Sequence, residues 1–193
     1  MKKLVVLLKK DIKESLRNNN TILMCLLPVV MLFIFKFMFG HTEEMEGFRE
    51  YFILTFVTSM MMSVIPVSLM PMMIAEEKEK NTLRTLMLSN VTAYEFLFSK
   101  VIVTLILMLF DGILIYVLSG AAIAGLPLYL LVVLVGSIAL LLIGAVFGII
   151  SPNQMTSGVI SSPLMIVLML GPMLTQFDPG LQVVTQFIPT AAI

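Results

Sequence analysis

The chain has 193 residues, of which 59% are hydrophobic and 12% are charged, and its formal net charge at pH 7 is zero. A soluble domain needs about 25% charged residues to solvate its surface, so this composition indicates a membrane protein. The few charges lie in clusters between long apolar segments, a placement that argues against nucleic-acid binding, which needs a basic face. Because the chain has one cysteine and one histidine, an internal disulfide and a metal site built from these residue types are excluded. We expect neither a metal nor a cofactor.

Residues 1–17 predict a basic amphipathic helix. Leu4, Val5, Leu8, Ile12 and Leu16 recur at helical spacing, and basic residues cover the rest of the surface. Such a helix is suited to lie in the interface of an anionic leaflet. A solvated leader ahead of the first membrane span is the alternative. Since no small-residue cleavage site follows the first apolar segment, we interpret that segment as a retained anchor.

Apolar segments long enough to cross a hydrocarbon core of about 30 Å follow one another along the chain. They cover residues 21–39, 51–75, 101–118, 128–150 and 157–176. The remaining residues, 177–193, are too short and too interrupted for a further crossing. We therefore expect one all-α transmembrane domain over residues 1–193, a polytopic helical bundle with an N-terminal interfacial helix.

The second segment carries Pro66 and Pro71, each of which removes a backbone donor and should kink or locally unwind the helix. It is also rich in methionine. A surface that repacks during transport would use such flexible side chains, but the pattern favours filling of a lipid-facing helix.

The basic residues predict the orientation of the bundle. Six lie before the first span and four lie between spans two and three, whereas the loop after span one has one and the loop after span three has none. The N-terminus and residues 76–100 should therefore face the cytoplasm.

Residues 76–100 predict two helices separated by a turn. The pattern from Glu76 to Leu88 is helical, and Ser89 and Asn90 stop it. A capping box formed by Thr92 and Glu95 then begins a second helix that leads into the third span. A short helix of this kind can present a rigid surface to a cytoplasmic partner. An ordinary solvated charged loop is the alternative.

This segment resembles the ABC-2 type permease family. The second span ends in Ala-Glu-Glu-Lys-Glu, which is followed by Asn-Thr-Leu, by Leu-Met-Leu-Ser and by a Glu that precedes Ser-Lys. Asn90 stands where many members have proline. The resemblance implies a dimeric pore whose cytoplasmic helices dock into grooves on separate ATP-hydrolysing subunits. The coupling residues that it implies are Glu76, Glu77, Lys78, Thr82, Leu83, Leu86, Met87, Leu88 and Ser89.

The resemblance extends to the C-terminal residues. Residues 177–193 are similar to the outer re-entrant helices that precede a sixth span in the family. The printed sequence ends before such a span, and we expect either a truncated product or part of a longer chain.

Asp111 is an acid deep inside a span, where a carboxylate costs a few kcal/mol or more. It could stay protonated, pair with a hydroxyl, line a substrate route, or hold helices together by a hydrogen bond.

Gly144 and Gly148 form a Gly-x-x-x-Gly step, and Gly136 falls on the same helical face. Small residues let helices approach closely, so we expect these glycines to pack against a neighbouring helix.

Motifs for a P-loop, a zinc protease or a serine hydrolase do not occur. We therefore expect no catalytic residue, and ATP hydrolysis in a partner. The predicted function is the permease subunit of an ATP-driven exporter in a bacterial cell membrane, moving a hydrophobic or amphipathic cargo. Its partners would be cytoplasmic ATPases, a second permease copy or relative, and membrane lipid.

Two other functions stay open. A non-transporting scaffold or immunity-type protein would bind a partner in the bilayer. A secondary transporter would use Asp111 as its proton site, although no inverted repeat and no further buried charge accompany that residue in the sequence.

Overall fold

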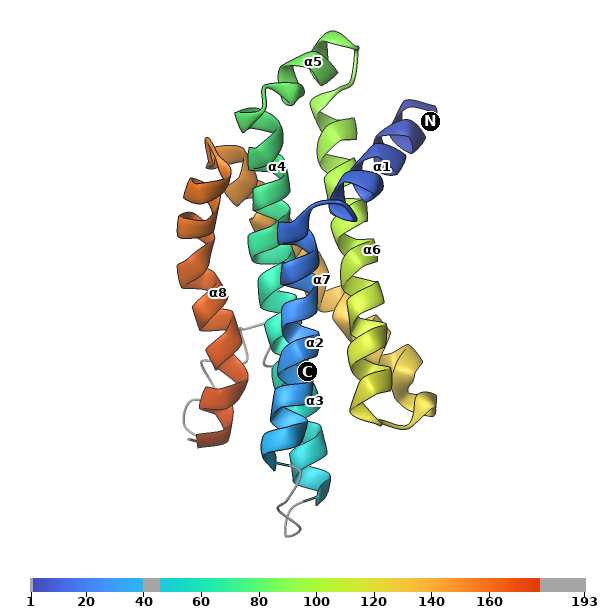
Figure 1. Ribbon diagram of the computed structural model, residues 1–193, viewed down its shortest axis with the longest axis vertical. Coiled ribbons are helices and arrows are strands. Elements are labelled where there is room, and N and C mark those ends of the chain that lie inside the picture. The colour runs from blue at the N-terminus through green and yellow to red at the C-terminus, as the bar shows by residue number, and fades with distance from the viewer. Residues whose placement is uncertain (1, 40–45, 178–193) are drawn as a thin grey trace.

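A computed structural model describes residues 2–39 and 46–177 of the chain, and within these residues it contains helices and no strand. Figure 1 shows the elements in chain order. They are α1 (Lys2–Ser15), α2 (Asn19–Phe39), α3 (Glu46–Val64), the π-helical turn η2 (Ile65–Leu69), α4 (Met70–Glu79), α5 (Thr82–Leu88), α6 (Ala93–Ser119), the 3-10 turn η3 (Ile123–Gly125), α7 (Leu126–Ile150) and α8 (Gln154–Phe177).

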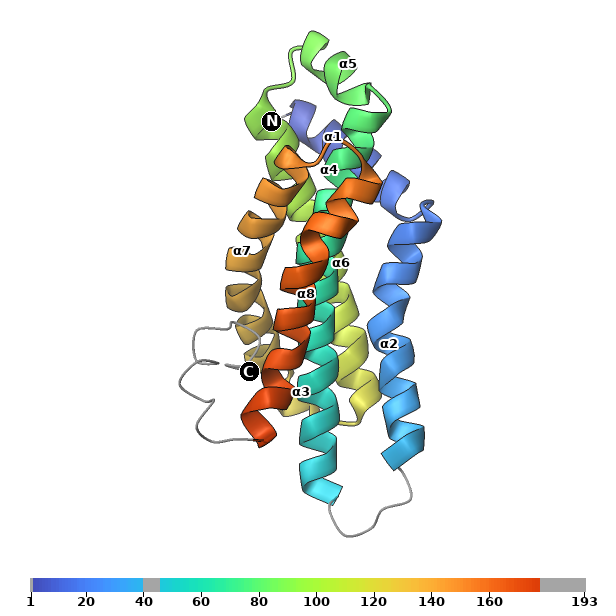
Figure 2. The same ribbon diagram turned by 90° about the vertical axis from the view of Figure 1, so that its left-hand side faces the viewer.

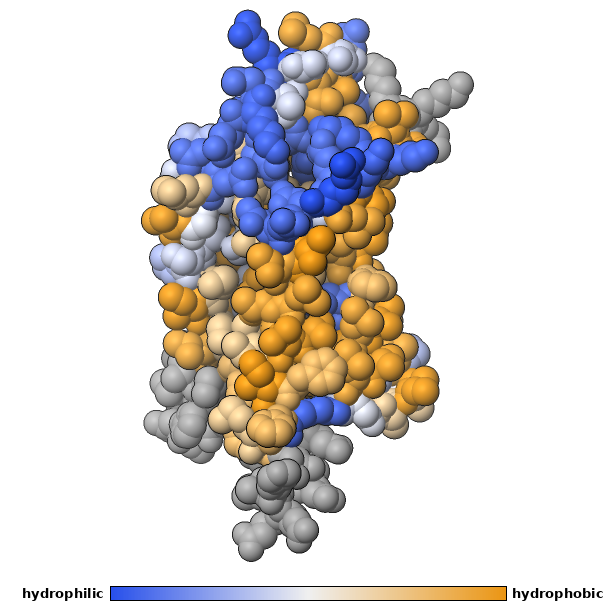
Figure 3. All heavy atoms as spheres, viewed as in Figure 1, coloured by the Kyte–Doolittle hydropathy of each residue, from blue (hydrophilic) through white to orange (hydrophobic). Residues whose placement is uncertain are grey.

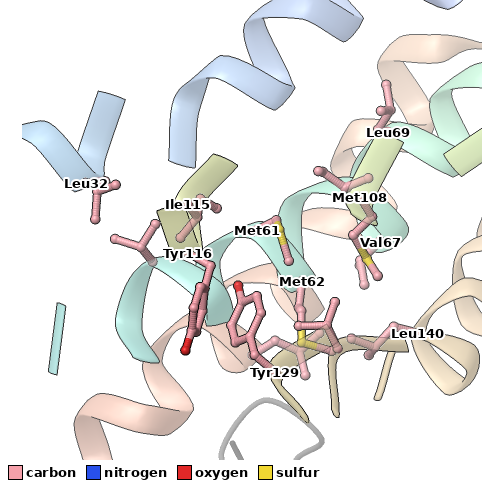
Figure 4. Close-up of a cluster of buried hydrophobic side chains, with 14 of the residues drawn as sticks. Leu32, Met61, Met62, Val67, Leu69, Met108, Ile115, Tyr116, Tyr129 and Leu140 are labelled. Atoms are coloured by element: carbon pink, nitrogen blue, oxygen red, sulfur yellow. The ribbon is translucent and has the colours of Figure 1, made fainter. Parts of the chain in front are cut away.

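The rod formed by α3, η2 and α4 is the centre of the bundle, and α2, α6, α7 and α8 surround it (Figures 1 and 2). Its most apolar window is 78% buried, against 39% or less in the other candidate spans. Met61 and Met62 are fully buried and pack with Tyr129 and Leu140 from α7 (Figure 4). The expectation that the methionine-rich segment faces lipid is therefore wrong. A central helix and a lipid-facing helix can have the same composition, so hydropathy alone could not separate them.

Candidate membrane spans in the described residues number four by length and composition: Asn19–Phe39, Tyr51–Glu79, Ala93–Ser119 and Ile123–Ile150. They correspond to the first four predicted segments. The fifth predicted segment falls within α8, and Gln154–Leu170 is the apolar part of α8 whose side chains the structure describes. A fifth crossing stays a prediction. The predicted re-entrant tail lies outside the described residues apart from its first one.

The prolines produce a local change of helix type, as expected. Residues Ile65–Leu69 form a π-helical turn around Pro66, and Pro71 follows in the first turn of α4. In a π-helical turn the Pro66 carbonyl would accept a hydrogen bond from the amide of residue 71. Pro71 has no N–H, so it cannot donate that hydrogen bond.

The predicted continuous helix from Glu76 to Leu88 is wrong, because a break separates α4 from α5. Asn81 has a φ of 57°, in the left-handed region that asparagine tolerates better than most residues. Asn90 also has a φ of 57° and ends α5. The capping box is confirmed, since the Glu95 amide donates to Thr92 Oγ1 at 3.2 Å and the Thr92 amide donates to Glu95 Oε2 at 2.9 Å.

Lys36 joins two spans at the opposite end of the bundle from α5. Its Nζ donates a hydrogen bond to the Leu118 carbonyl at 2.8 Å, in the last turn of α6. A cation near a helix C-terminus is favoured by the carbonyls and the helix dipole. The end of α2 is therefore held against the end of α6.

Candidate functional site

Hydrophilic side chains gather at one end of the bundle, around α1, the end of α4 and α5, whereas the faces of the long helices below are hydrophobic (Figure 3). We call this region the charged end and define it as α1, residues 76–80, α5 and the first turns of α6. It brings together segments that are up to 89 residues apart in the sequence.

Lys100 lies between two carboxylates at the base of the charged end. Its Nζ donates to Asp11 Oδ1 at 2.9 Å and to Glu77 Oε1 at 3.1 Å, and 3% of its side chain is exposed. The neighbouring Ser99 hydroxyl donates to Asp11 Oδ2 at 2.6 Å. The ammonium also lies 5.6 Å from the centre of the Phe96 ring. Buried charges persist only when they are paired and hydrogen-bonded, and these contacts provide both.

Glu77 connects α4 to α1, to α5 and to α6. Besides Lys100, its carboxylate accepts a hydrogen bond from Lys10 Nζ at 2.7 Å and another from the Thr82 hydroxyl. Burial lowers the pKa of the Lys10 ammonium, but the hydrogen bond to Glu77 and the charges of Glu77, Glu14 and Asp11 outweigh it. The net effect raises the pKa of Lys10 above its ordinary value, so Lys10 stays charged.

Glu76 connects α4 to the turn between α1 and α2. Its Oε2 accepts a hydrogen bond from the Asn18 side chain at 3.0 Å, and its Oε1 pairs with Lys80. The two oxygens thus face different parts of the charged end.

Lys78 and Glu79 hold the turn between α7 and α8. Lys78 Nζ donates to the carbonyls of Gly148 and Ser151, each at 3.0 Å, and to that of Ile149. Glu79 Oε2 accepts a hydrogen bond at 3.2 Å from the amide of Gln154, the first residue of α8. A cation at the C-terminus of α7 and an anion at the N-terminus of α8 both complement the helix dipoles.

Four consecutive side chains, from Glu76 to Glu79, therefore bind four parts of the bundle: α1 with the turn after it, α5, α6, and the turn between α7 and α8. We call them the charged hub. Displacement of α4 at this point would act directly on α1, α6, α7 and α8, because each of these helices or its adjoining turn is hydrogen-bonded to the hub.

α5 projects beyond the end of the bundle (Figures 1 and 2). Leu83 and Leu86 are half-buried and pack on a small cluster formed by Met70, Ile74, Phe96 and Leu141. Leu88 is 78% exposed, Met87 is 49% exposed, and Arg84 and Ser89 are also exposed.

The predicted coupling residues therefore fall into two sets. Glu76, Glu77, Lys78, Thr82, Leu83 and Leu86 contact the rest of the chain, whereas Met87, Leu88 and Ser89 face outward.

Three carboxylates approach one another closely enough to suggest a metal site. One oxygen from each of Asp11, Glu14 and Glu77 lies within 4.8 Å of the others. Lys10 and Lys100 already donate to this group at 2.7–3.1 Å. The cluster is therefore an ion-pair network whose negative charge is neutralised by ammonium groups.

Asp111 lies on α6 with 2% of its surface exposed, and its Oδ2 has no hydrogen-bond partner among the described residues. The Tyr129 hydroxyl on α7 lies 3.0 Å from Thr58 Oγ1. A role for Asp111 on a cargo route stays a prediction.

Gly144 and Gly148 face the central rod. A Cβ built on Gly144 would overlap the Pro66 carbonyl oxygen, and one on Gly148 would lie 2.8 Å from Ile74 Cβ. Gly136 is half-buried. The approach of α7 to the π-helical turn therefore requires the absence of a side chain at position 144.

The sequence interpretation missed Asp11, Lys10 and Lys100. A signal was present in α1, where Leu7, Asp11 and Ser15 follow at four-residue spacing and are buried together. The apolar residues that we predicted to form one face of this helix are not buried against the bundle, since Val5, Ile12 and Leu16 are exposed. An acid between buried positions of a helix implies a cation on a neighbouring element, although the sequence does not say which one.

The long apolar helices and the charged network at one end define a polytopic α-helical membrane protein. The model of the ABC-2 type transporter family matches residues 2–189, and the chain belongs to that family. It is thus a permease component of an ABC transporter, and not itself the catalytic part. No curated protein and no solved structure matches the chain.

Proposed function

We propose that this chain is the permease subunit of an exporter whose charged end faces the cytoplasm and whose α5 docks on an ABC ATPase. The positive-inside distribution of lysine and arginine supports this orientation. Family membership supports an ATPase as the general kind of partner.

The observation that carries the proposal is the combination of an exposed α5 tip with the charged hub at its base. Met87 and Leu88 offer apolar side chains to a partner, and the hub bonds α4 to four other parts of the bundle. Closure of the ATPases would move α5, and the hub would pass that movement to the membrane-spanning helices.

A second permease copy or a close relative would complete the pore, and a hydrophobic or amphipathic cargo would leave outward. The exposed hydrophobic side chains of α2, α6 and α7 support a lipid-facing or partner-facing surface. Asp111 is the proposed polar contact on the cargo route, because its Oδ2 is buried and unpartnered.

The test compares ATPase association in the native host for wild type, Leu88→Asp and Ile123→Asp. Leu88 is 78% exposed on α5, and Ile123 is 79% exposed in η3, beyond the other end of α6. Each variant places the same charge at an exposed position, and Ile123 is the first residue of its candidate span, at the edge of the apolar segment, so neither should disturb folding.

The measurement is ATP hydrolysis by the detergent-purified material, together with mass-spectrometric identification of a subunit that carries a P-loop. We expect ATPase activity to co-purify with wild type and Ile123→Asp and to fall at least about tenfold with Leu88→Asp, a loss expected when a charge is buried in an apolar contact. ATPase recovery that is equal with all three proteins would contradict docking through the α5 tip. An absence of ATPase from all three would favour the scaffold function.

A further inference from the structure

The charged end contains a polar cavity of about 710 Å³. It opens between α1, the start of α2, the end of α4 and the start of α6, and Gln154 of α8 also lines it. Its volume lies within the range of small-molecule sites, about 300–1,000 Å³.

The charges that line this cavity are not all neutralised. Five basic and four acidic side chains take part. Three of the acids have close cationic partners: Asp11 binds Lys100, Glu77 binds Lys10 and Lys100, and Glu76 binds Lys80. The fourth, Glu14, lies 3.5 Å from Lys10.

Two cations on the cavity wall remain available. Lys13 and Arg17 line the cavity and form no ion pair with any residue that the structure describes. The cavity therefore carries an excess of one positive charge, held by groups on α1 and the turn after it.

The N-terminus of α2 and a buried hydroxyl also line this space. The first turn of α2, Asn19 to Thr21, lines the cavity, and Asn18 Oδ1 accepts from the Asn20 amide at 3.0 Å. The N–H groups of a first helical turn lack intrahelical acceptors and favour an anion. Ser15 lines the cavity as well, is 3% exposed, and has a buried hydroxyl without a hydrogen-bond partner among the described residues.

Apolar side chains adjoin these donors on the outer surface. Leu16 is 62% exposed, Ile22 is 39% exposed and Leu23 is 64% exposed, and all three flank the lining residues in sequence. In a bilayer such side chains contact acyl chains, and basic pockets beside membrane helices bind anionic headgroups.

We propose that this cavity binds the phosphate headgroup of an anionic phospholipid, with Lys13, Arg17 and Ser15 as its ligands and the acyl chains lying along α1 and α2. A phosphodiester carries one negative charge, which matches the excess on the cavity wall. The bound lipid would fix α1 against α2 and α4 at the point where the charged hub begins. This inference does not depend on an ATPase partner.

The test uses the full chain, purified in a neutral detergent. Binding of dioctanoyl phosphatidylglycerol, dioctanoyl phosphatidylcholine and glycerol 3-phosphate is measured by native mass spectrometry. We expect phosphatidylglycerol to bind about tenfold tighter than phosphatidylcholine, since each basic group near an anionic headgroup contributes appreciably to binding. Equal binding of the two lipids would overturn the proposal. Binding of glycerol 3-phosphate as tight as that of phosphatidylglycerol would assign the cavity to a soluble phosphate instead.

A pair of charge-matched variants locates the site. Lys13→Gln with Arg17→Gln removes both available cations, whereas Lys9→Gln with Arg84→Gln removes two exposed cations of the charged end that do not line the cavity. The first variant should lose most of the preference for phosphatidylglycerol, and the second should keep it. If both double variants lost the preference for phosphatidylglycerol equally, the charged end would attract anionic lipid through its overall charge, and a defined site would be contradicted. Ser15→Ala should weaken the binding of both lipids a few-fold, because both carry the phosphodiester that the Ser15 hydroxyl would contact.

Discussion

Lys100 lies in the first turns of α6, and 3% of its side chain is exposed. Its partners are carboxylates from α1 and α4. An ammonium in this position costs desolvation free energy, which the two ion pairs and the Ser99 contact to Asp11 offset. Such a residue holds three elements in register, and none of the three can move alone without exposing a buried charge.

Substitution of Lys100 by Met should lower the free energy of unfolding by about 3–5 kcal/mol, because Asp11 would keep only the Ser99 hydroxyl as a partner. Lys80→Met serves as the control. Lys80 pairs with Glu76 but is 61% exposed, so its removal should cost about 1 kcal/mol or less. The midpoint of denaturation in mixed detergent micelles measures both.

The double variant Asp11→Asn, Lys100→Met should recover part of the loss, since it removes the unpaired carboxylate as well as the ammonium. If Lys100→Met and Lys80→Met had equal effects, the network would have no special role in stability.

The central rod combines two prolines with a close contact to α7. In the π-helical turn the Pro66 carbonyl points toward Gly144, whose Cα–H can approach the carbonyl oxygen. The Gly-x-x-x-Gly step thus packs on a part of the rod that has lost a backbone donor, and it shields that part from lipid.

Gly144→Ala should destabilise the bundle by about 1–3 kcal/mol, because its Cβ would overlap backbone atoms that cannot move without distorting the rod. Gly158→Ala is the matched control, since a Cβ at this helical position has nothing within 4 Å. Alanine at position 158 should leave the free energy of unfolding unchanged or raise it slightly. Denaturation midpoints of the two variants give the comparison, and equal midpoints would show that α7 can shift without cost.

At the scale of the whole molecule the two ends of the bundle differ in chemistry. One end carries α1, the charged hub and α5, and the other carries Lys36 and the turn through η3. This asymmetry follows from the distribution of basic residues along the chain, since both long basic segments lie at the same end.

The orientation can be tested with single cysteines in a Cys25→Ala background. Lys9→Cys places a thiol on the exposed surface of α1, and Ile123→Cys places one in η3 at the other end. We expect a membrane-impermeant maleimide to label Ile123→Cys in intact cells and Lys9→Cys only after permeabilisation. The reverse pattern would invert the proposed orientation and exclude cytoplasmic docking by α5.

Local signals in the sequence predict the class of protein and most of its helices. Apolar length, the capping box at Thr92 and the positions of proline are local signals, and the helical hydrogen bonds that they control are local too. The family resemblance also arose from contiguous residues, and residues 2–189 match that family.

The packing of the helices determines which helix is central and which partner each charged side chain from Glu76 to Glu79 contacts. In a membrane protein both the interior and the lipid are apolar, so hydropathy does not tell a buried helix face from an exposed one. The partners of Asp11 and Lys78 lie 89 and about 70 residues away. Nothing local specifies such pairs, because they exist only once the long helices have packed side by side.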